Sequence, residues 1–183
     1  VVNEGCKGID PCNVIIIIGQ KIYPFDNLRL ETFNKILSGH SNIKVVAEVM
    51  GNYDPDTSLT GVQDALQANA GTKIHVILSN ADQHLVGADI ALEDAGYVVE
   101  DLFLMGGGAS AIGLDMVRSG RWDYTKGDFP YSLGLYGTEA VIKKLRGESF
   151  ESEINMDERG PVPGLINKSV LDKFPDFKGE WKG

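Results

Sequence analysis

One stretch of this sequence constrains the fold more than any other: residues 14–18 read Val-Ile-Ile-Ile-Ile, and Gly19 ends the run. Because the run does not alternate apolar and polar residues, a strand formed by it is buried on both faces, as in the centre of a parallel sheet. The run is also far too short to cross a bilayer. The flanking segments are therefore expected to provide helices for both faces of such a sheet.

The segments that follow alternate between strand-like and helix-like patterns joined by short loops. Further strands are predicted at residues 43–49, 74–78, 102–105 and 121–125, and helices at residues 30–37, 59–66, 82–95 and 111–119. This alternation is typical of a parallel sheet covered by helices, with right-handed crossovers. We therefore predict an α/β fold, a three-layer doubly wound parallel sheet.

The pattern changes in the C-terminal part of the chain. Residues 131–146 predict one more amphipathic helix, and residues 165–170 predict a short strand. The tail beyond them is expected to be an exposed terminus. We accordingly expect a ligand-binding α/β lobe at residues 1–130, followed by a helix and tail at residues 131–183.

Charge and motifs exclude several functions. Lys and Arg number 17 against 26 for Asp and Glu, which gives a net charge of −9. This charge repels phosphate backbones and anionic lipid, so we expect no nucleic-acid partner. No nucleophile elbow, phosphate-binding glycine loop or metal-ligand spacing is present, so we predict no catalytic residues, no cofactor and no metal.

Two cysteines, Cys6 and Cys12, flank a short segment that contains Gly8 and Pro11. Such a segment can fold back, and a disulfide there would imply an oxidising compartment. The alternative is two unpaired thiols, because the Cα separation that a disulfide requires cannot be read from sequence. Both interpretations stay open at this point.

Candidate ligand-binding residues lie in the loops that follow the predicted strands, because ligands of open parallel sheets bind beyond the carboxyl ends of the strands. In strand order these residues are Asn27, Arg29, Tyr53, Asn80, Asp82, Gly108 and Asp128. Amides and carboxylates hydrogen-bond hydroxyl groups, and aromatic rings cover apolar C–H faces. The set therefore predicts a polyhydroxyl ligand.

Each candidate also has a purely structural interpretation. Asp82 opens a predicted helix, so N-capping alone would account for it. Tyr53 could be an ordinary core or surface ring, and the three glycines that end at Gly108 could form a tight turn. His84 lies within a predicted helix and is expected to be structural.

Two segments carry a resemblance to a known family: residues 79–88, SNADQHLVGA, and residues 120–124, GRWDY. They resemble the sugar-type periplasmic (solute-binding) proteins of ABC importers, the cluster that includes ribose and galactose binders. The resemblance extends over most of the chain and implies a periplasmic-binding-protein-like type I lobe. It further implies a non-enzymatic sugar- or polyol-binding component of an importer, working by closure of two lobes on the ligand. We expect a periplasmic or extracellular location, associated with the membrane through a permease, and a Cys6–Cys12 bond in the exported protein.

Two positions match the site of the ribose-type proteins. Tyr53 takes the place of the aromatic ring that stacks on the sugar, and Asp128 that of the polar residue after the fifth strand. The arginine near the start of the first helix corresponds to Asn27, with Arg29 close by.

Two other positions depart from that site. The amide before the third helix falls on Ala81, between Asn80 and Asp82. Gly108 stands where the family has a carboxylate, so a bidentate hydroxyl clamp is lost. These departures argue against ribose itself and leave the ligand class unchanged.

The resemblance also concerns the extent of the chain, which corresponds to the second, C-terminal lobe. A first lobe of about a hundred residues would be missing. The helix at residues 131–146 carries apolar residues that would pack on that lobe. Without it, we expect the helix to fold back on its own lobe, to pack on a second copy in a homodimer, or to be covered by a separate first-lobe chain.

Two rival functions share this fold class. The effector lobe of a LacI-type transcription regulator would be revealed by an upstream helix-turn-helix. A small flavodoxin-like enzyme would require a phosphate loop or a cluster of perturbed pKa values at the strand ends.

Overall fold

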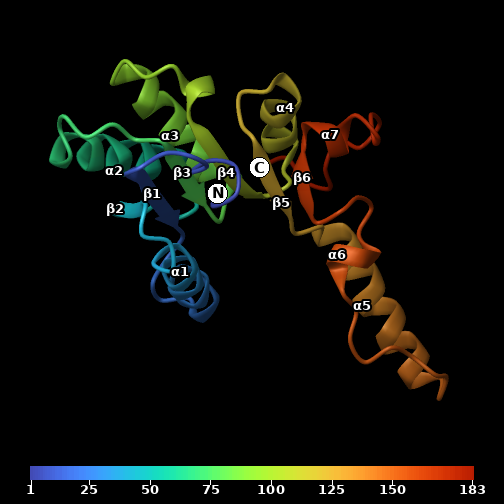
Figure 1. The fold of residues 1–183 in the computed structure, drawn as a ribbon. Helices are drawn as coiled ribbons and strands as arrows, with labels where there is room; N and C mark the ends of the chain where they lie inside the picture. The colour runs from blue at the N-terminus through green and yellow to red at the C-terminus, as the bar shows by residue number, and fades with distance from the viewer.

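The computed structural model describes residues 1–183 and is built on one sheet (Figure 1). Its strands are β1 (Cys12–Ile18), β2 (Ile43–Met50), β3 (Val76–Ser79), β4 (Phe103–Gly108), β5 (Tyr124–Gly127) and β6 (Leu165–Asn167). The strand order is β2-β1-β3-β4-β5-β6; the first five strands run parallel and β6 pairs antiparallel with β5. The predicted α/β class and doubly wound parallel sheet are confirmed.

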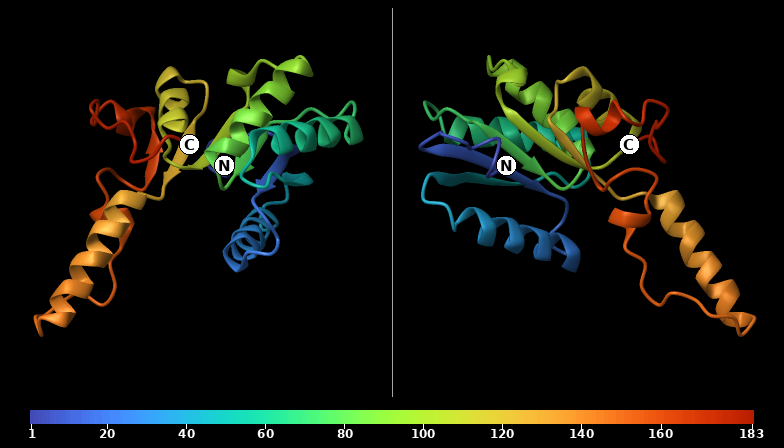
Figure 2. Two further views of the ribbon diagram at one scale, coloured as in Figure 1. Left: turned by 180° about the vertical axis from the view of Figure 1, so that it is seen from behind. Right: turned by 45° about the vertical axis from the view of Figure 1, so that its right-hand side comes forward.

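Helices connect these strands and cover the sheet. They are α1 (Pro24–Leu37), α2 (Pro55–Ala68), α3 (Asp82–Asp94), the 3-10 helix η1 (Val99–Asp101), α4 (Ala111–Ser119), α5 (Pro130–Leu145), α6 (Met156–Arg159) and α7 (Lys168–Leu171). In Figure 2, α1 lies on one face of the sheet, and α2 and α3 lie on the other. The sheet therefore forms the middle of three layers.

Strand β1 supplies side chains to both cores, as its sequence predicts. All its residues are buried. Ile15 and Ile17 lie in the core shared with α2, α3 and α4, whereas Val14, Ile16 and Ile18 lie in the core shared with α1. This alternation follows from the two-residue period of a strand. The run of β-branched residues is thus the hydrophobic centre of the lobe.

The loop before β1 is closed by a disulfide. Cys6 and Cys12 are bonded, with their Cα atoms 5.5 Å apart. Both cysteines are buried in the core on the α1 side. Of the two interpretations that the sequence leaves open, the structure has the disulfide.

Strand β5 begins at Tyr124, later than the predicted start at residue 121. The side chains just before it bond to α3 and hold a turn there. The guanidinium of Arg121 pairs with the carboxylate of Asp89. The indole Nε1 of the buried Trp122 donates to Asp89 Oδ2 at 3.0 Å. These bonds hold the turn in place, and the strand starts only at Tyr124.

The C-terminal segments separate into two parts. Helix α5 projects away from the sheet, and none of its residues is buried (Figures 1 and 2). The expectation that this helix folds back on its own lobe is therefore wrong. The chain then returns through α6 to the sheet, where Ile166 and Leu171 are buried.

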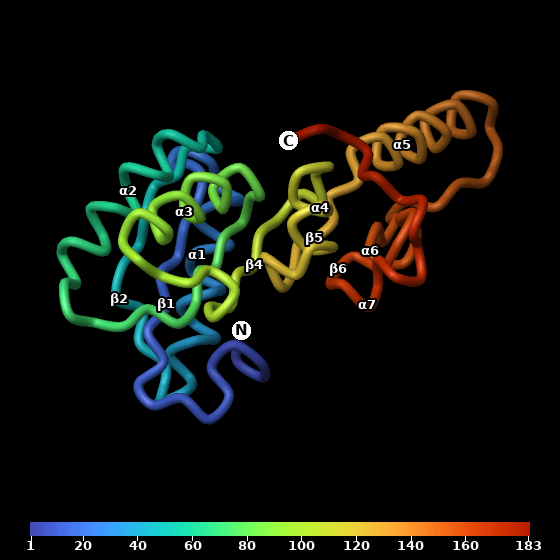
Figure 3. Tube along the Cα trace, turned by 90° about the horizontal axis from the view of Figure 1, so that it is seen from above, coloured from blue at the N-terminus to red at the C-terminus, as the bar shows by residue number.

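The tail is also less exposed than predicted. Figure 3 shows the chain returning past α6 and α7 to an end near α4. The backbone N–H of Ala111 donates to the carbonyl of Trp181 at 3.0 Å. Residues of the tail thus pack on the lobe, because their backbone groups find partners at the start of α4.

Candidate functional site

The carboxyl ends of the parallel strands meet at one edge of the sheet and surround a hollow of about 240 Å³, which we call the strand-end hollow. It is lined by Phe25, Arg29, Tyr53, Asn80, Ala81, Gln83, Gly107, Gly108, Asp128 and Trp181. The structure therefore brings together most of the residues predicted from the sequence, although they lie at or after the ends of five different strands. Asn27 and Asp82 are not among the lining residues.

Tyr53 is held in place by a carboxylate that sequence reasoning did not identify. The Tyr53 hydroxyl donates to Oδ1 of the fully buried Asp26 at 2.6 Å. Asn80 Nδ2 donates to the same oxygen at 2.6 Å, and the backbone N–H of Gln20 donates to Asp26 Oδ2 at 2.7 Å. Burial raises the pKa of the Tyr53 phenol, and the bond to Asp26 raises it further. The phenol is therefore neutral and points its hydrogen away from the ligand side.

The backbone around Tyr53 needs further support, because Asn52 and Tyr53 have φ values of 53° and 57°. Such left-handed conformations are costly for residues with a side chain. His84 Nε2 accepts a hydrogen bond from the backbone N–H of Tyr53 at 2.8 Å, while its Nδ1 lies 2.9 Å from Ser79 Oγ. Burial lowers the pKa of His84 to about 4, so the ring is neutral. The structural role predicted for His84 is thus to fix the Tyr53 loop.

Two acceptor atoms next to the hollow have no partner within the protein. They are Asn80 Oδ1 and Gln83 Oε1, and both are buried. Because Asn80 Nδ2 donates to Asp26, Oδ1 is the atom of that amide left without a partner. A buried acceptor without a partner is costly, and a hydroxyl donor would satisfy it.

Opposite charges face each other at the hollow. The guanidinium of Arg29, from α1, lies 3.9 Å from the carboxylate of Asp128, which follows β5. Arg29 also lies over the ring of Phe25, 5.3 Å from its centroid. Both charged side chains remain partly exposed, at 39% and 47%, so they are free to exchange this long contact for hydrogen bonds to a ligand.

Asp82 has a different place from the one predicted. It is only 1% exposed, and its Oδ2 accepts from Ser110 N at 2.9 Å and Ser110 Oγ at 2.8 Å. Its Oδ1 accepts from Thr125 Oγ1 at 2.7 Å. Burial raises the pKa of Asp82 to about 6, although these bonds lower it. The N-cap of α3 is Ala81, so the capping interpretation of Asp82 is also wrong.

The carboxylate of Asp82 instead joins the loop after β4 to β5, beneath the site. Asp82 also borders a neighbouring hollow of about 270 Å³, which it shares with Tyr53 and Gln83. Asn27, the other candidate outside the strand-end hollow, donates from Nδ2 to the carbonyl of Lys21 at 2.7 Å. That bond fixes the loop before α1.

The position of Gly108 is filled from the far end of the chain. Trp181 Nε1 donates to the carbonyl of Gly108 at 2.7 Å. A Cβ atom added at Gly108 would lie 2.6 Å from Trp181 Cζ2. The indole thus occupies the space that a side chain at position 108 would need. Sequence reasoning missed Trp181 because the tail carries no motif and was expected to be exposed.

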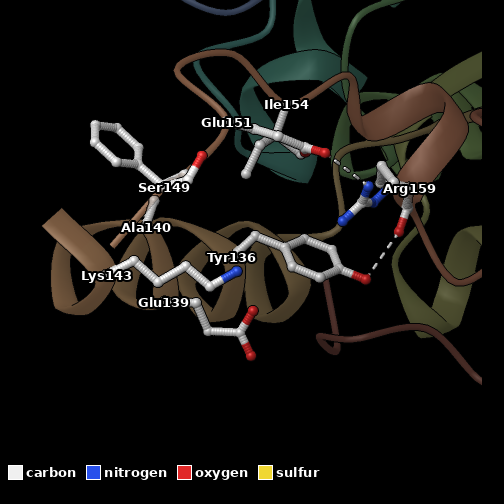
Figure 4. Close-up of a pocket in the computed structure, with 9 residues that line it drawn as sticks. Tyr136, Glu139, Ala140, Lys143, Ser149, Glu151, Ile154 and Arg159 are labelled. Atoms are coloured by element: carbon white, nitrogen blue, oxygen red, sulfur yellow. Dashed lines mark hydrogen bonds and ion pairs between the residues drawn. The ribbon is translucent and has the colours of Figure 1, made fainter. Parts of the chain in front are cut away.

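A further hollow, of about 290 Å³, lies between α5 and the segment that returns from it (Figure 4). Tyr136 OH donates to the carbonyl of Arg159 at 3.2 Å, and Arg159 pairs with Glu151 at 3.4 Å. The charged side chains there are half exposed or more, and no buried acceptor lacks a partner. The candidate ligand site is therefore the strand-end hollow.

The structure contains no group of three or more His, Cys, Asp or Glu side chains placed to hold a metal ion. None of its helices combines the length and apolar character that a membrane span requires.

Comparison with known proteins gives one family and many similar folds. A family model described as "Periplasmic binding protein domain" matches residues 2–149. Among curated proteins, none matches the sequence.

Solved structures with the same fold include several solute-binding proteins. A protein of Bacillus halodurans C-125 with bound myo-inositol is 21% identical, with a TM-score of 0.72, over 88% of this chain and 53% of that one. A protein of Actinobacillus succinogenes 130z with bound D-allose is 20% identical, with a TM-score of 0.78, over 92% and 57%. A galactofuranose binding protein is 17% identical, with a TM-score of 0.80, over 97% and 58%. The chain thus spans between half and three fifths of the length of these proteins.

Proposed function

Because the chain belongs to the periplasmic binding protein domain family, we propose that it serves as the solute-binding component of an ABC-type importer. Its ligand is a sugar or a similar polyhydroxyl molecule, bound at the strand-end hollow. The protein binds this ligand and performs no chemistry on it. The groups with shifted pKa values that are buried near the strand ends, Asp82 and His84, use their polar atoms in hydrogen bonds within the protein. The raised pKa of Tyr53 keeps its phenol neutral, and its hydroxyl donates to Asp26.

The observation that carries this proposal is the unpartnered acceptor Asn80 Oδ1, buried beside the ring of Tyr53. A sugar presents hydroxyl donors at its rim and apolar C–H groups on its faces. Hydroxyl groups satisfy Asn80 Oδ1 and Gln83 Oε1, while the aromatic rings cover the C–H faces. Arg29 and Asp128 supply a donor and an acceptor for further hydroxyls.

The hollow is partly open to solvent. Ligands of this size are usually enclosed for most of their surface. We infer that a first lobe closes over it by a hinge motion and also covers the apolar side of α5. In this proposal, residues 1–130 form one ligand-binding lobe together with the returning segment that supplies β6, α7 and the tail. Helix α5 is the part that reaches toward the other lobe. A permease is the further partner of the closed, loaded form, and a homodimer is the alternative cover for α5.

The disulfide between Cys6 and Cys12 favours this role over that of an effector lobe in a LacI-type regulator. Disulfides persist in oxidising compartments and are rare in the cytosol. We therefore propose a periplasmic or extracellular location.

The test uses the intact protein, by which we mean residues 1–183 together with the proposed first lobe. Calorimetry measures the binding of myo-inositol, D-allose and L-arabinose to this protein and to its Asn80→Ala variant. We expect at least one of these probes to bind, and Asn80→Ala to weaken that binding about tenfold. Asn34→Ala is the matched control, since Asn34 is a half-buried asparagine of α1 that donates to Glu48 and does not line the hollow. No binding of any probe, or equal binding by Asn80→Ala, would contradict the proposal.

A further inference from the structure

The C-terminal tail is fastened by hydrogen bonds at Trp181 and at residues shortly before it. The Arg118 guanidinium donates to the carbonyl of Phe177, and the backbone N–H of Ala111 donates to the carbonyl of Trp181 at 3.0 Å. Between them, Glu180 Oε2 accepts from the backbone N–H of Ser132 in the first turn of α5 at 2.9 Å. These contacts give the tail a defined path to the strand-end hollow.

The indole of Trp181 is oriented at the end of β4. Its only donor, Nε1, is used by the carbonyl of Gly108 at 2.7 Å. Its Cζ2 atom occupies the space beside Gly108, where any Cβ would collide with it. Trp181 lines the hollow, as Tyr53 does, and with Nε1 already bonded its ring carbons offer no hydrogen bond to a ligand.

We propose that Trp181 is a ligand-contacting, specificity-determining residue of the strand-end hollow, and that it selects sugars or polyols that present an apolar C–H group toward the end of β4. This inference rests on the proposed sugar-binding function. A ligand hydroxyl placed against the ring carbons would lose its hydration without gaining a partner, whereas a C–H group gains contact area. This position of Trp181 requires glycine at residue 108, because any Cβ atom there would collide with the indole.

The test follows Trp181 by calorimetry and by intrinsic fluorescence in the intact protein, with myo-inositol, D-allose and L-arabinose as probes. The chain has two tryptophans, and Trp122 is 1% exposed and bonded to Asp89. Within residues 1–183 Trp181 is therefore the tryptophan that a ligand can reach, and the part of the emission change that is lost in the Trp181 variants reports on it. The variants are Trp181→Ala and Trp181→Phe, and the matched control is Phe174→Ala, which removes a tail ring that does not line the hollow.

We expect Trp181→Ala to weaken binding about tenfold and Trp181→Phe to weaken it less, because phenylalanine keeps a ring. The emission change on binding is reduced in both variants by the part that Trp181 contributes, and it persists in full in Phe174→Ala. If the intact protein binds a probe but Trp181→Phe and Trp181→Ala keep the same affinity, the inference is overturned while the sugar-binding function stands. If no probe binds to the intact protein, the proposed function and this inference fall together. Far-UV circular dichroism checks that each variant is folded. If Trp181→Ala is unfolded, the comparison of the parent protein with Trp181→Phe decides the outcome.

Discussion

The phenolic oxygen of Tyr53 lies 2.6 Å from Oδ1 of Asp26, a carboxylate with no exposed surface. Through this bond, helix α1 fixes the aromatic ring that follows β2. Asn80, which follows β3, bonds the same oxygen, so one buried carboxylate joins three of the loops around the strand-end hollow. The bonds to Asp26 therefore fix Tyr53 and Asn80 in place before a ligand binds.

Asp26→Ala tests this organisation. Removing the carboxylate leaves Tyr53 and Asn80 without their shared acceptor, so we expect the free energy of unfolding to fall by about 3 kcal/mol. Tyr53→Phe removes only one of the bonds and should cost about 1 kcal/mol. Urea unfolding of the two variants, with the exposed Asp115→Ala as control, measures the difference. Equal stability of Asp26→Ala and the control would contradict the role given to Asp26.

The pH dependence of stability should contain two opposed contributions. Burial lowers the pKa of His84 from 6.5 to about 4, so the unfolded state binds more protons between these values and stability rises with pH there. Burial raises the pKa of Asp82 from 3.8 to about 6, so the folded state binds more protons between these values and stability falls as pH rises. The two effects offset each other in the shared range of about pH 4 to 6.

Single variants separate these two effects. Asp82→Asn should remove the Asp82 contribution and retain that of His84. The free energy of unfolding should then rise more steeply from about pH 4 to 6.5 than in the parent protein. His84→Gln should give a curve that falls over the range in which Asp82 ionises. Urea unfolding at several pH values measures both, and identical curves for the parent protein and Asp82→Asn would contradict the assignment.

Arg29→Ala should affect binding far more than folding. The pair with Asp128 is long and both side chains are partly exposed, so its loss changes the free energy of unfolding by less than about 0.5 kcal/mol. If Arg29 donates to ligand hydroxyls, the same substitution weakens sugar binding about tenfold. Calorimetry and urea unfolding of this one variant give both values. A large loss of stability with unchanged affinity would show that Arg29 has a structural role instead.

The sequence predicts those features that depend on a short stretch of the chain, such as the burial of one strand or the end at which it stops. The unbroken β-branched run predicted the buried centre of the sheet, because burial on both faces requires apolar residues at every position. Tyr53, Asn80 and Asp128 could be placed at one edge of the sheet, because parallel strands all end on the same side.

Contacts between residues far apart in the sequence could not be predicted from such local patterns. Asp26 looked like an ordinary acidic residue in the first turn of a helix, and only the fold brings it under Tyr53 and Asn80. Asp82 looked like a helix cap, but its carboxylate turns inward to Ser110. Trp181 reaches Gly108 across 73 residues of sequence, and nothing in the tail predicted this contact.

The chain described here should self-associate when it is prepared alone. Leu145 on α5 is 82% exposed, and Leu135 and Ile142 are 43% and 41% exposed. Each square ångström of this apolar surface that another chain covers contributes about 25 cal/mol. Light scattering should show dimers, and substituting Leu135→Ser, Ile142→Ser and Leu145→Ser together should return the chain to monomers. A strict monomer before substitution would contradict the expectation.

The same preparation should bind sugar weakly or not at all. Half of a closing cleft leaves much of the ligand in water, so little of the available contact area is gained. Calorimetry of residues 1–183 and of the intact protein, with the same probe, compares the two. Micromolar binding by residues 1–183 alone would show that closure by a second lobe is not required.

The central claim is that a sugar or polyol binds at the strand-end hollow, and a crystal structure of the intact protein soaked with the tightest of the three probes tests it most directly. The account predicts a ligand hydroxyl within hydrogen-bond distance of Asn80 Oδ1 and ligand carbons against the ring of Tyr53. A ligand bound away from these two residues, or a hollow that stays empty while the probe binds in solution, would contradict it.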